Sequence, residues 1–328
     1  MERELSIFAL GDSKEFGEKL CGGLGISLSK CDEYSFPNGE SYIRILENVR
    51  GKDVIVISSL YNDNKLSVDQ KVWRLGLFND AAKLSSAGRI INVVPYMAYC
   101  RQDRLTKSRE ALSAKVLARF LENTGCNRLI SLDWHSYAVQ NAYDIPLDIL
   151  PVIHLLVDKI AEFLKNDTHV VALAPDVGAS KTRIKDFARI LQKRIGKDVY
   201  MAVTDKSRKT GEEIESRFLI GDVDGADVVI CDDETATGTS LINAADKAKE
   251  KGARNIYACV SHCNLNEKGI EKIENSIITK LITTDSIHIN SNLKSNKIIC
   301  IPCYNLLGEA VIRINKNLSV SSLFQGIK

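Results

Sequence analysis

The sequence is organised around residues 227–240, which read DVVICDDETATGTS. Val228 to Cys231 form a short continuous apolar run, which is typical of a parallel strand buried on both faces. Asp232 and Asp233 follow at the end of this run, and a polar turn containing Gly238 leads into a helix-like stretch, LINAADKAKEKG. Because ligands of open α/β sheets bind beyond the carboxyl ends of the strands, this turn is the first candidate for a binding site.

The residue types in the turn predict a site for a sugar phosphate. The start of a helix offers unpaired backbone N–H groups and the positive end of the helix dipole, and both favour a phosphate. The two carboxylates would repel a phosphate, but they can accept hydrogen bonds from vicinal hydroxyls or hold a metal ion. The stretch resembles the motif that binds phosphoribosyl diphosphate (PRPP), which ends in Thr-Gly-x-Thr/Ser, here Thr237 to Ser240. By itself it also fits phosphoribosyltransferases, or an ordinary strand–turn–helix with solvated acids.

Composition excludes several classes of protein. The chain has 328 residues, 45% hydrophobic and 26% charged, which suffices for two globular α/β domains. A net charge of +2 gives no argument for nucleic acid or an anionic membrane as a partner. No apolar run approaches the roughly 20 residues of a membrane span, and the N-terminus lacks the long apolar region of a signal peptide. We therefore expect no nucleic-acid or membrane partner.

The nine cysteines indicate reduced thiols, so we expect a cytoplasmic location rather than a disulfide framework. Cys300 and Cys303, combined with Cys259, His262 and Cys263, give enough ligands for a zinc site. Both groups lie in apolar, strand-like runs, KIICIP and NIYACVSH. Buried thiols are therefore the expectation, and zinc is the alternative.

Ten apolar, strand-like runs alternate with helix-like stretches along the chain. The runs are SIFAL, DVIVISSL, IINVVPYM, RLISLDWH, HVVALAPD, DVYMAVTDK, DVVICDD, NIYACVSH, KLITTDS and KIICIP. Helix-like stretches such as SAKVLARFLENTG separate several of them, which predicts βαβ units and mainly parallel sheets. Pro146 and Pro151 interrupt the pattern, so we place a domain boundary near residue 150.

Polar residues stand at the ends of the other strand-like runs, where a common site would need them. They are Arg101, Gln102, Asp103, Arg104, Asp133, His135, Asp176, Lys206 and Arg208. Taken singly, each has an ordinary explanation, since a histidine after a strand is usually structural and charges in a loop are usually solvated. On one rim, they would supply cations for phosphate and ligands for a metal.

With these residues in view, the whole chain resembles the ribose-phosphate diphosphokinases (PRPP synthetases). The similarity runs through FPNGESYIRILENVRG, VVPYMAYCRQDR, SLDWHS, APDVGA and VTDKSR to the carboxylate motif and a closing SVSSLF, in the order of the family. Phosphoribosyltransferases lack the FPNGE, RQDR and DWHS segments. The resemblance therefore favours the diphosphokinases over the transferases.

The resemblance implies two similar Rossmann-like domains of the type I phosphoribosyltransferase kind, with mainly parallel sheets. Residues 1–149 and 309–328 would form an N-terminal ATP-binding domain, because the C-terminal stretch packs back onto the first domain in this family. Residues 150–308 would form the ribose-5-phosphate-binding domain. Family members are homo-oligomers built from dimers, commonly hexamers, with adenine pockets completed across subunits, so the same is expected here.

The activity implied is transfer of the β,γ-diphosphoryl group of Mg-ATP to the C1 hydroxyl of ribose 5-phosphate, giving 5-phosphoribosyl 1-diphosphate and AMP. Such chemistry depends on alignment and charge neutralisation. The alternative is a non-catalytic, regulatory homologue that binds nucleotide or sugar phosphate within a hetero-oligomer. The acid pair and the cations Lys206 and Arg208 argue against that alternative, because such a homologue should lose them.

The resemblance also assigns roles to single residues. The nucleotide would be held by Phe36, Asn38, Glu40, Arg101, Gln102 and Asp103. The cofactor Mg²⁺ would be held directly or through water by His135 and Asp176. Ribose 5-phosphate would be held by Asp232, Asp233, Ala236, Thr237, Gly238, Thr239 and Ser240. The catalytic groups would be Lys206 and Arg208, on a mobile loop, together with His135.

Several positions depart from the family pattern, and three of them are residues assigned to the substrates. Asn38 stands where the family usually has Asp, Ala236 where it often has Asp or Ser, and Thr239 where it usually has Gly. An amide oxygen at position 38 still accepts a hydrogen bond from an adenine amino group. These changes indicate a divergent member of the family.

Overall fold

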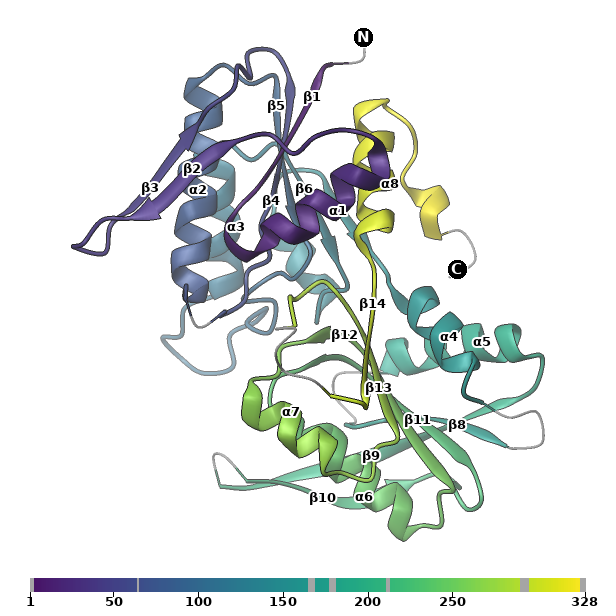
Figure 1. Cartoon of the computed structure of the whole chain (residues 1–328). Coiled ribbons are helices and arrows are strands. Elements are labelled where there is room, and N and C mark those ends of the chain that lie inside the picture. The colour runs from purple at the N-terminus through teal and green to yellow at the C-terminus, as the bar shows by residue number, and fades with distance from the viewer. Residues whose placement is uncertain are drawn as a thin grey trace.

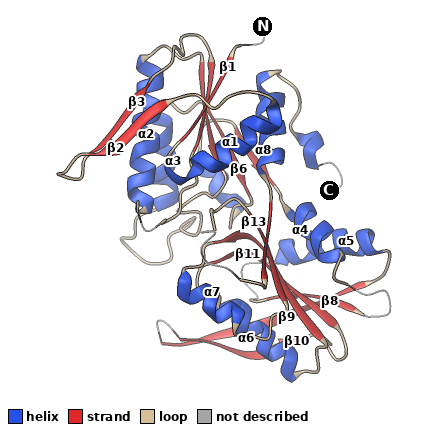
Figure 2. Ribbon diagram, in the orientation of Figure 1, coloured by secondary structure: helices blue, strands red, loops and turns tan. Residues whose placement is uncertain are grey.

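Two sheets form the framework of the chain (Figures 1 and 2). The computed structural model describes residues 3–63, 65–164, 169–176, 181–210, 213–289 and 295–324, without the side chains of residues 181, 182, 205–217 and 324. The first sheet consists of β1 (Leu5–Ala9), β4 (Asp53–Ile57), β5 (Arg89–Val94), β6 (Arg128–Leu132) and β7 (Leu147–Leu150), side by side in that order and all parallel. Its interior strand β4 is buried throughout, as a parallel strand covered on both faces must be.

The second sheet has seven strands. They are β8 (Val170–Ala174), β9 (Val199–Thr210), β10 (Glu213–Ile220), β11 (Asp227–Thr235), β12 (Asn255–Cys263), β13 (Lys280–Thr284) and β14 (Ile298–Ile301). Their order across the sheet is β10-β9-β8-β11-β12-β13-β14, with β10 antiparallel to β9 and the remaining pairs parallel. The predicted α/β fold with two mainly parallel sheets is confirmed.

Helices cover both faces of each sheet. α1 (Lys14–Leu24) and α8 (Tyr304–Asn315) lie on one face of the first sheet, and α2 (Val68–Leu84) and α3 (Ser113–Thr124) on the other (Figure 1). On the second sheet, α4 (Ile153–Ala161) and α5 (Lys181–Ile195) pack against one face, and α6 (Thr239–Glu250) and α7 (Glu267–Glu274) against the other. One buried apolar cluster contains residues of both sheets, so the two units share a core.

All ten predicted strand-like runs form strands of these two sheets. The described residues form four further strands that the runs did not predict. The hairpin of β2 (Cys31–Ser35) and β3 (Ser41–Ile45) is half-exposed and polar, so it lacks an apolar run. β7 is short and lies between the two prolines, and β10 is an edge strand. The helix-like stretch SAKVLARFLENTG forms α3, which is capped by its final glycine, Gly125, at φ +117°. No described helix is both long and apolar enough to span a membrane.

The C-terminal helix α8 returns to the first unit and packs against α1 (Figure 1). Asn315, near its end, donates from Nδ2 to Asp53 Oδ2 and to the Arg3 carbonyl, each at 3.0 Å. Asp53 is fully buried and also accepts from Arg89 Nε at 2.9 Å. Burial by itself would raise the pKa of Asp53, but the donors Arg89 and Asn315 hold it below its usual value. The assignment of residues 309–328 to the first domain stays a prediction.

We expect Asn315→Ala to lower the free energy of unfolding by about 1–3 kcal/mol, because it removes a donor from a buried carboxylate. Urea denaturation measures the loss. Glu309→Ala is the matched control on the exposed side of α8, where Glu309 pairs with Arg313 at 2.7 Å; its effect should stay within about 0.5 kcal/mol. Equal effects of the two substitutions would contradict the tethering role of Asn315.

Candidate active site

A cavity of about 210 Å³ lies where the carboxyl ends of the two sheets meet. The first unit contributes residues 96–102, which follow β5, and residues 133–135, which follow β6. The second unit contributes Asp233 and Glu234 of β11 and His262 of β12. Residues far apart in the sequence thus line one cavity, and the predicted strand-end residues among them are Arg101, Gln102, Asp133 and His135.

The acid pair stands at the switch point of the second sheet. β8 has β9 on one side and β11 on the other, so the order of the strands reverses there. β11 pairs with β8 only through Ile230, whereas it pairs with β12 as far as Thr235. The acids Asp232 and Asp233 therefore lie within β11, not after it as the sequence suggested. They lie on the part of β11 that extends past its pairing with β8. Asp176 follows β8 by two residues and belongs to the same rim.

His135 and Asp233 join the two units directly. His135 Nδ1 lies 2.8 Å from Asp233 Oδ2, across 98 residues of sequence. This hydrogen bond raises the pKa of His135, although partial burial opposes the shift. Burial would also raise the pKa of Asp233, but its contacts with His135 and Asp232 hold it well below the usual range. Burial, with the neighbouring charge of Asp233, raises the pKa of Asp232 to about 8.

A second pair crosses the cavity beside the first. Arg101 Nη2 lies 3.4 Å from Glu234 Oε2, and the hydroxyl of Tyr96 donates to Glu234 Oε1 at 3.1 Å. Gln102 lines the same cavity, whereas Asp103, the next residue, does not. Sequence reasoning assigned no role to Glu234. Its position directly after the acid pair was the available signal.

The turn between β11 and α6 has the geometry of a helix-terminal anion site. Gly238 is the N-cap of α6 at φ +75°, and a Cβ there would lie 3.3 Å from Ile273. That conformation and that contact both favour glycine. Thr239 donates its backbone N–H to Thr237 Oγ1 at 3.4 Å. Helix α6 begins at Thr239, two residues before the predicted helix-like stretch.

The three predicted adenine-binding residues lie away from the cavity. Phe36, Asn38 and Glu40 lie in the turn of the β2–β3 hairpin, which projects from the first unit (Figure 1). The Phe36 ring is 41% exposed and meets the Tyr34 ring edge to face, with centroids 5.2 Å apart. Asn38 Oδ1 accepts from the backbone N–H of Glu40 at 3.1 Å, which tightens the turn. Within one chain these residues form a separate, exposed surface.

Lys206 and Arg208 lie in a strand rather than in the predicted loop. Their backbone belongs to β9, opposite Ser216 and Ile214 of the antiparallel strand β10. Their side chains lie outside the described part of the structure, so their catalytic role stays a prediction.

Comparison with known proteins identifies the family. Residues 5–125 match the N-terminal domain of ribose phosphate pyrophosphokinase, and residues 186–325 match the phosphoribosyl synthetase-associated domain. A curated ribose-phosphate pyrophosphokinase of Thermosipho africanus is 37% identical over 324 residues, covering 99% of this chain and 98% of the relative. The chain belongs to the ribose-phosphate pyrophosphokinase family. Ribose-phosphate pyrophosphokinase 1 of Listeria innocua is also 37% identical, over 322 residues and 98% of both chains.

The architecture agrees with this membership. The crystal structure of the phosphoribosylpyrophosphate synthetase from Mycobacterium smegmatis superposes with a TM-score of 0.86 at 25% identity, covering 96% of this chain and 100% of the other. The resemblance inferred from the sequence and the predicted fold are confirmed.

In this member of the family, Asp133 is the structural centre of the site, a role that the sequence did not reveal. It is 5% exposed and has a positive φ of 26°. Its Oδ2 accepts from Arg183 Nη2 at 3.0 Å and from the hydroxyl of Ser261. His262 Nε2 lies 3.0 Å from the Asp133 carbonyl oxygen and donates to it, which leaves His262 Nδ1 to accept from Ser286 at 2.8 Å. Asp133 therefore binds the end of β6 to the second unit.

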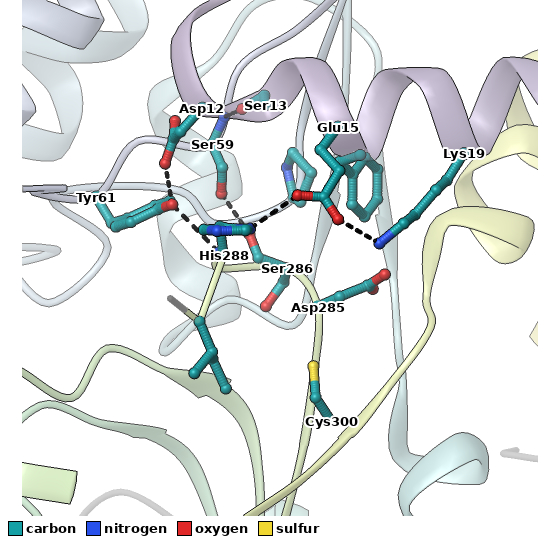
Figure 3. A pocket seen from close by; sticks show the side chains of 13 residues that line it. Asp12, Ser13, Glu15, Lys19, Ser59, Tyr61, Asp285, Ser286, His288 and Cys300 are labelled. Carbon is teal, nitrogen blue, oxygen red and sulfur yellow. Dashed lines mark hydrogen bonds and ion pairs between the residues drawn. The ribbon is translucent and has the colours of Figure 1, made fainter. Parts of the chain in front are cut away.

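A second cavity, of about 200 Å³, lies along the same contact between the units (Figure 3). Tyr61 donates its hydroxyl proton to Asp12 and accepts from the backbone N–H of His288 at 3.2 Å. The hydroxyl of Ser59 donates to the carbonyl of Ser286. These polar groups are bonded to one another across the boundary of the units, so we interpret this cavity as part of the domain contact.

The cysteines differ in one respect from the expectation of buried thiols. Cys259, Cys263 and Cys303 are buried, whereas Cys300 is exposed at the second cavity, because β14 lies at the edge of its sheet. Within the described ranges, no three His, Cys, Asp or Glu side chains are grouped so as to hold a metal ion.

The burial of His262 predicts a loss of stability in acid. Burial lowers the pKa of His262 below its ordinary value of 6.5, so the unfolded chain takes up a proton before the folded one. The stability contributed by neutral His262 is complete above pH 6.5. It declines as the pH falls from 6.5 to the folded pKa, below which it is lost. Below pH 6.5, we expect the free energy of unfolding of the wild type to fall by up to about 1.4 kcal/mol per pH unit more than that of His262→Gln.

Urea denaturation between pH 5 and 8 tests this expectation. His169→Gln, which replaces an exposed histidine, is the control and should retain the wild-type slope. A wild-type slope identical to that of His262→Gln would contradict it.

Proposed function

We propose that the chain is a ribose-phosphate diphosphokinase, which transfers the β,γ-diphosphoryl group of ATP to the C1 hydroxyl of ribose 5-phosphate and releases AMP. The contact between His135 and Asp233 carries the proposal, because it brings the end of the first sheet against the acid pair of the second. A reaction between two substrates, one held by each unit, requires such a junction. The curated relatives that span the whole chain bear the name of this enzyme.

The second unit holds the sugar phosphate. Asp232 and Asp233 bind the ribose 2- and 3-hydroxyls, and the raised pKa of Asp232 lets one carboxyl donate while the other accepts. The 5-phosphate binds the turn at residues 236–240, where the N-terminus of α6 presents its backbone N–H groups. Gly238 is needed there because of its positive φ.

The first unit holds the nucleotide. Arg101 and Gln102 line the cavity and bind the phosphates and ribose, with Asp103 beside them. The hairpin residues Phe36, Asn38 and Glu40 serve the adenine of a neighbouring subunit, which explains why they lie outside the cavity of their own chain. This assignment supports a dimer-based homo-oligomer, with the hexamer of the family as the expected form.

The donors at the cavity fit Mg²⁺ as the cofactor. Asp233 holds His135 through Nδ1, which turns the ring so that Nε2 serves a metal ion or its bound water, an arrangement common at metal sites. Asp176, on the same rim, adds a carboxylate, and two protein groups with retained water suit Mg²⁺. When bound, the ion would neutralise charge on the phosphates. Lys206 and Arg208 add two cations to the same task.

A non-catalytic homologue would not need this set of groups. Both acids, His135 and the two cations of β9 are present, and a regulatory subunit has no use for all of them. We place the protein in the cytoplasm, because its substrates are metabolites and its nine thiols form no disulfide.

The reaction is tested by incubating the purified protein with ATP, ribose 5-phosphate and Mg²⁺ and following AMP. We expect AMP to form only when ribose 5-phosphate is present. Lys206→Ala should lower turnover on the order of 10²–10³, because it removes a charge that stabilises the transition state. Lys193→Ala, at an exposed position of α5, is the control and should retain wild-type turnover. Undiminished turnover in Lys206→Ala would remove the role of that lysine.

Removal of the divalent cation should stop the reaction. With excess chelator, AMP formation should fall to the background measured without ribose 5-phosphate, and added Mg²⁺ should restore it. Continued AMP formation in excess chelator would contradict a role for Mg²⁺.

A further inference from the structure

The ion pair between Arg101 and Glu234 links the two units across the active-site cavity. Arg101 lies in the segment after β5, and Glu234 lies in β11 opposite His262 of β12. The shortest contact is 3.4 Å, from Arg101 Nη2 to Glu234 Oε2, and Tyr96 donates to the other carboxylate oxygen at 3.1 Å. Both oxygens of Glu234 thus have a partner in the first unit.

The two partners differ in their exposure to solvent. The side chain of Glu234 is 8% exposed, whereas that of Arg101 is 54% exposed. A buried carboxylate is unfavourable without a cation or donors, and two further acids, Asp232 and Asp233, precede Glu234 in the same strand. Glu234 therefore depends on Arg101, while about half of the Arg101 side chain remains exposed to the solvent and to an incoming ligand.

A nucleotide must compete with this internal carboxylate. In the proposed function, Arg101 binds the phosphates of ATP, and this inference rests on that assignment. A polyphosphate carries more negative charge than a carboxylate and matches the guanidinium fork equally well. The repulsion between two anions at one guanidinium in a cavity of about 210 Å³ favours exchange over sharing.

We propose that Glu234 is a positioning residue that holds Arg101 across the empty cleft and yields it to the nucleotide phosphates. The carboxylate acts as an intramolecular competitor, so it lowers the affinity for the nucleotide. Because the pair joins the two units, the exchange also removes one contact between them when the nucleotide binds. Glu234 itself touches no reacting atom.

The substitution Glu234→Gln tests the competition, because the amide keeps the size of the side chain and still accepts from Tyr96. We expect the variant to bind α,β-methylene-ATP, whose α,β bridge cannot be cleaved, more tightly by roughly two- to fivefold, the range for loss of one partly exposed charge partner. Isothermal titration calorimetry measures this affinity. The KM for ATP should fall with it, while the KM for ribose 5-phosphate stays within twofold.

Two further variants separate competition from a structural effect. Tyr96→Phe removes one donor to Glu234 and leaves the ion pair, so Glu234 depends more on Arg101; nucleotide affinity should fall, opposite to the change in Glu234→Gln. Glu250→Gln alters the total charge equally at a remote pair, where Glu250 lies 2.7 Å from Lys247, and should leave the affinity unchanged.

Unchanged or weaker nucleotide binding in Glu234→Gln, with wild type still forming AMP, overturns the competition and leaves the proposed function in place. Absence of both AMP formation and nucleotide binding in wild type would instead overturn the proposed function. If Glu234→Gln does not fold, Tyr96→Phe decides: weaker binding supports competition, and unchanged or tighter binding overturns it.

Discussion

The site depends on the buried carboxylate of Asp133. It stands just beyond β6, and its donors Arg183 and Ser261 belong to the second unit, so satisfying it requires the two units to be in contact. A buried carboxylate without donors is strongly unfavourable. Because the Asp133 side chain must reach these donors, the backbone adopts a positive φ at this residue. Two residues later, the side chain of His135 faces the acid pair. The contact between His135 and the acid pair is thus a consequence of how the buried charge of Asp133 is satisfied.

Much of this arrangement was predictable because it is written in local sequence. Continuous apolar runs predict the interior strands, because strands buried on both faces do not alternate between apolar and polar residues. Polar residues directly after those runs specify the rim, since parallel strands end at one edge. Contacts made over long distances were not predictable: nothing around Asp133 in the sequence points to Arg183 or Ser261. Glu234 follows the acid pair in the sequence, but its partner Arg101 appears only when the sheets meet.

The hairpin of β2 and β3 shows a second limit of sequence reasoning. The FPNGE segment indicates that these residues bind a nucleotide, but a local segment does not indicate whether the nucleotide lies in the cavity of the same chain or of another chain. Phe36 packs against Tyr34, and Tyr34 stacks on Tyr42 with ring centroids 4.6 Å apart. Tyr34 and Phe36 remain 45% and 41% exposed. Exposed aromatic rings held rigidly on a projecting hairpin are typical of surfaces that another molecule covers. The prediction of a composite adenine pocket therefore agrees with the position of these rings, whereas a pocket within one chain does not.

The distribution of charge in the cleft agrees with the proposal that several cations take part in the reaction. Asp232, Asp233 and Glu234 are consecutive, and such a strand repels any polyphosphate that approaches it. The acids cannot be removed if they bind the hydroxyls of the sugar. The cleft instead gives two of the three carboxylates a partner from the first unit: His135 holds Asp233, and Arg101 holds Glu234. In the proposed reaction, an anionic substrate would enter by exchanging partners rather than by adding charge. A metal ion and the cations of β9 would then balance the remaining negative charge. Acids and phosphates can share one cavity for this reason.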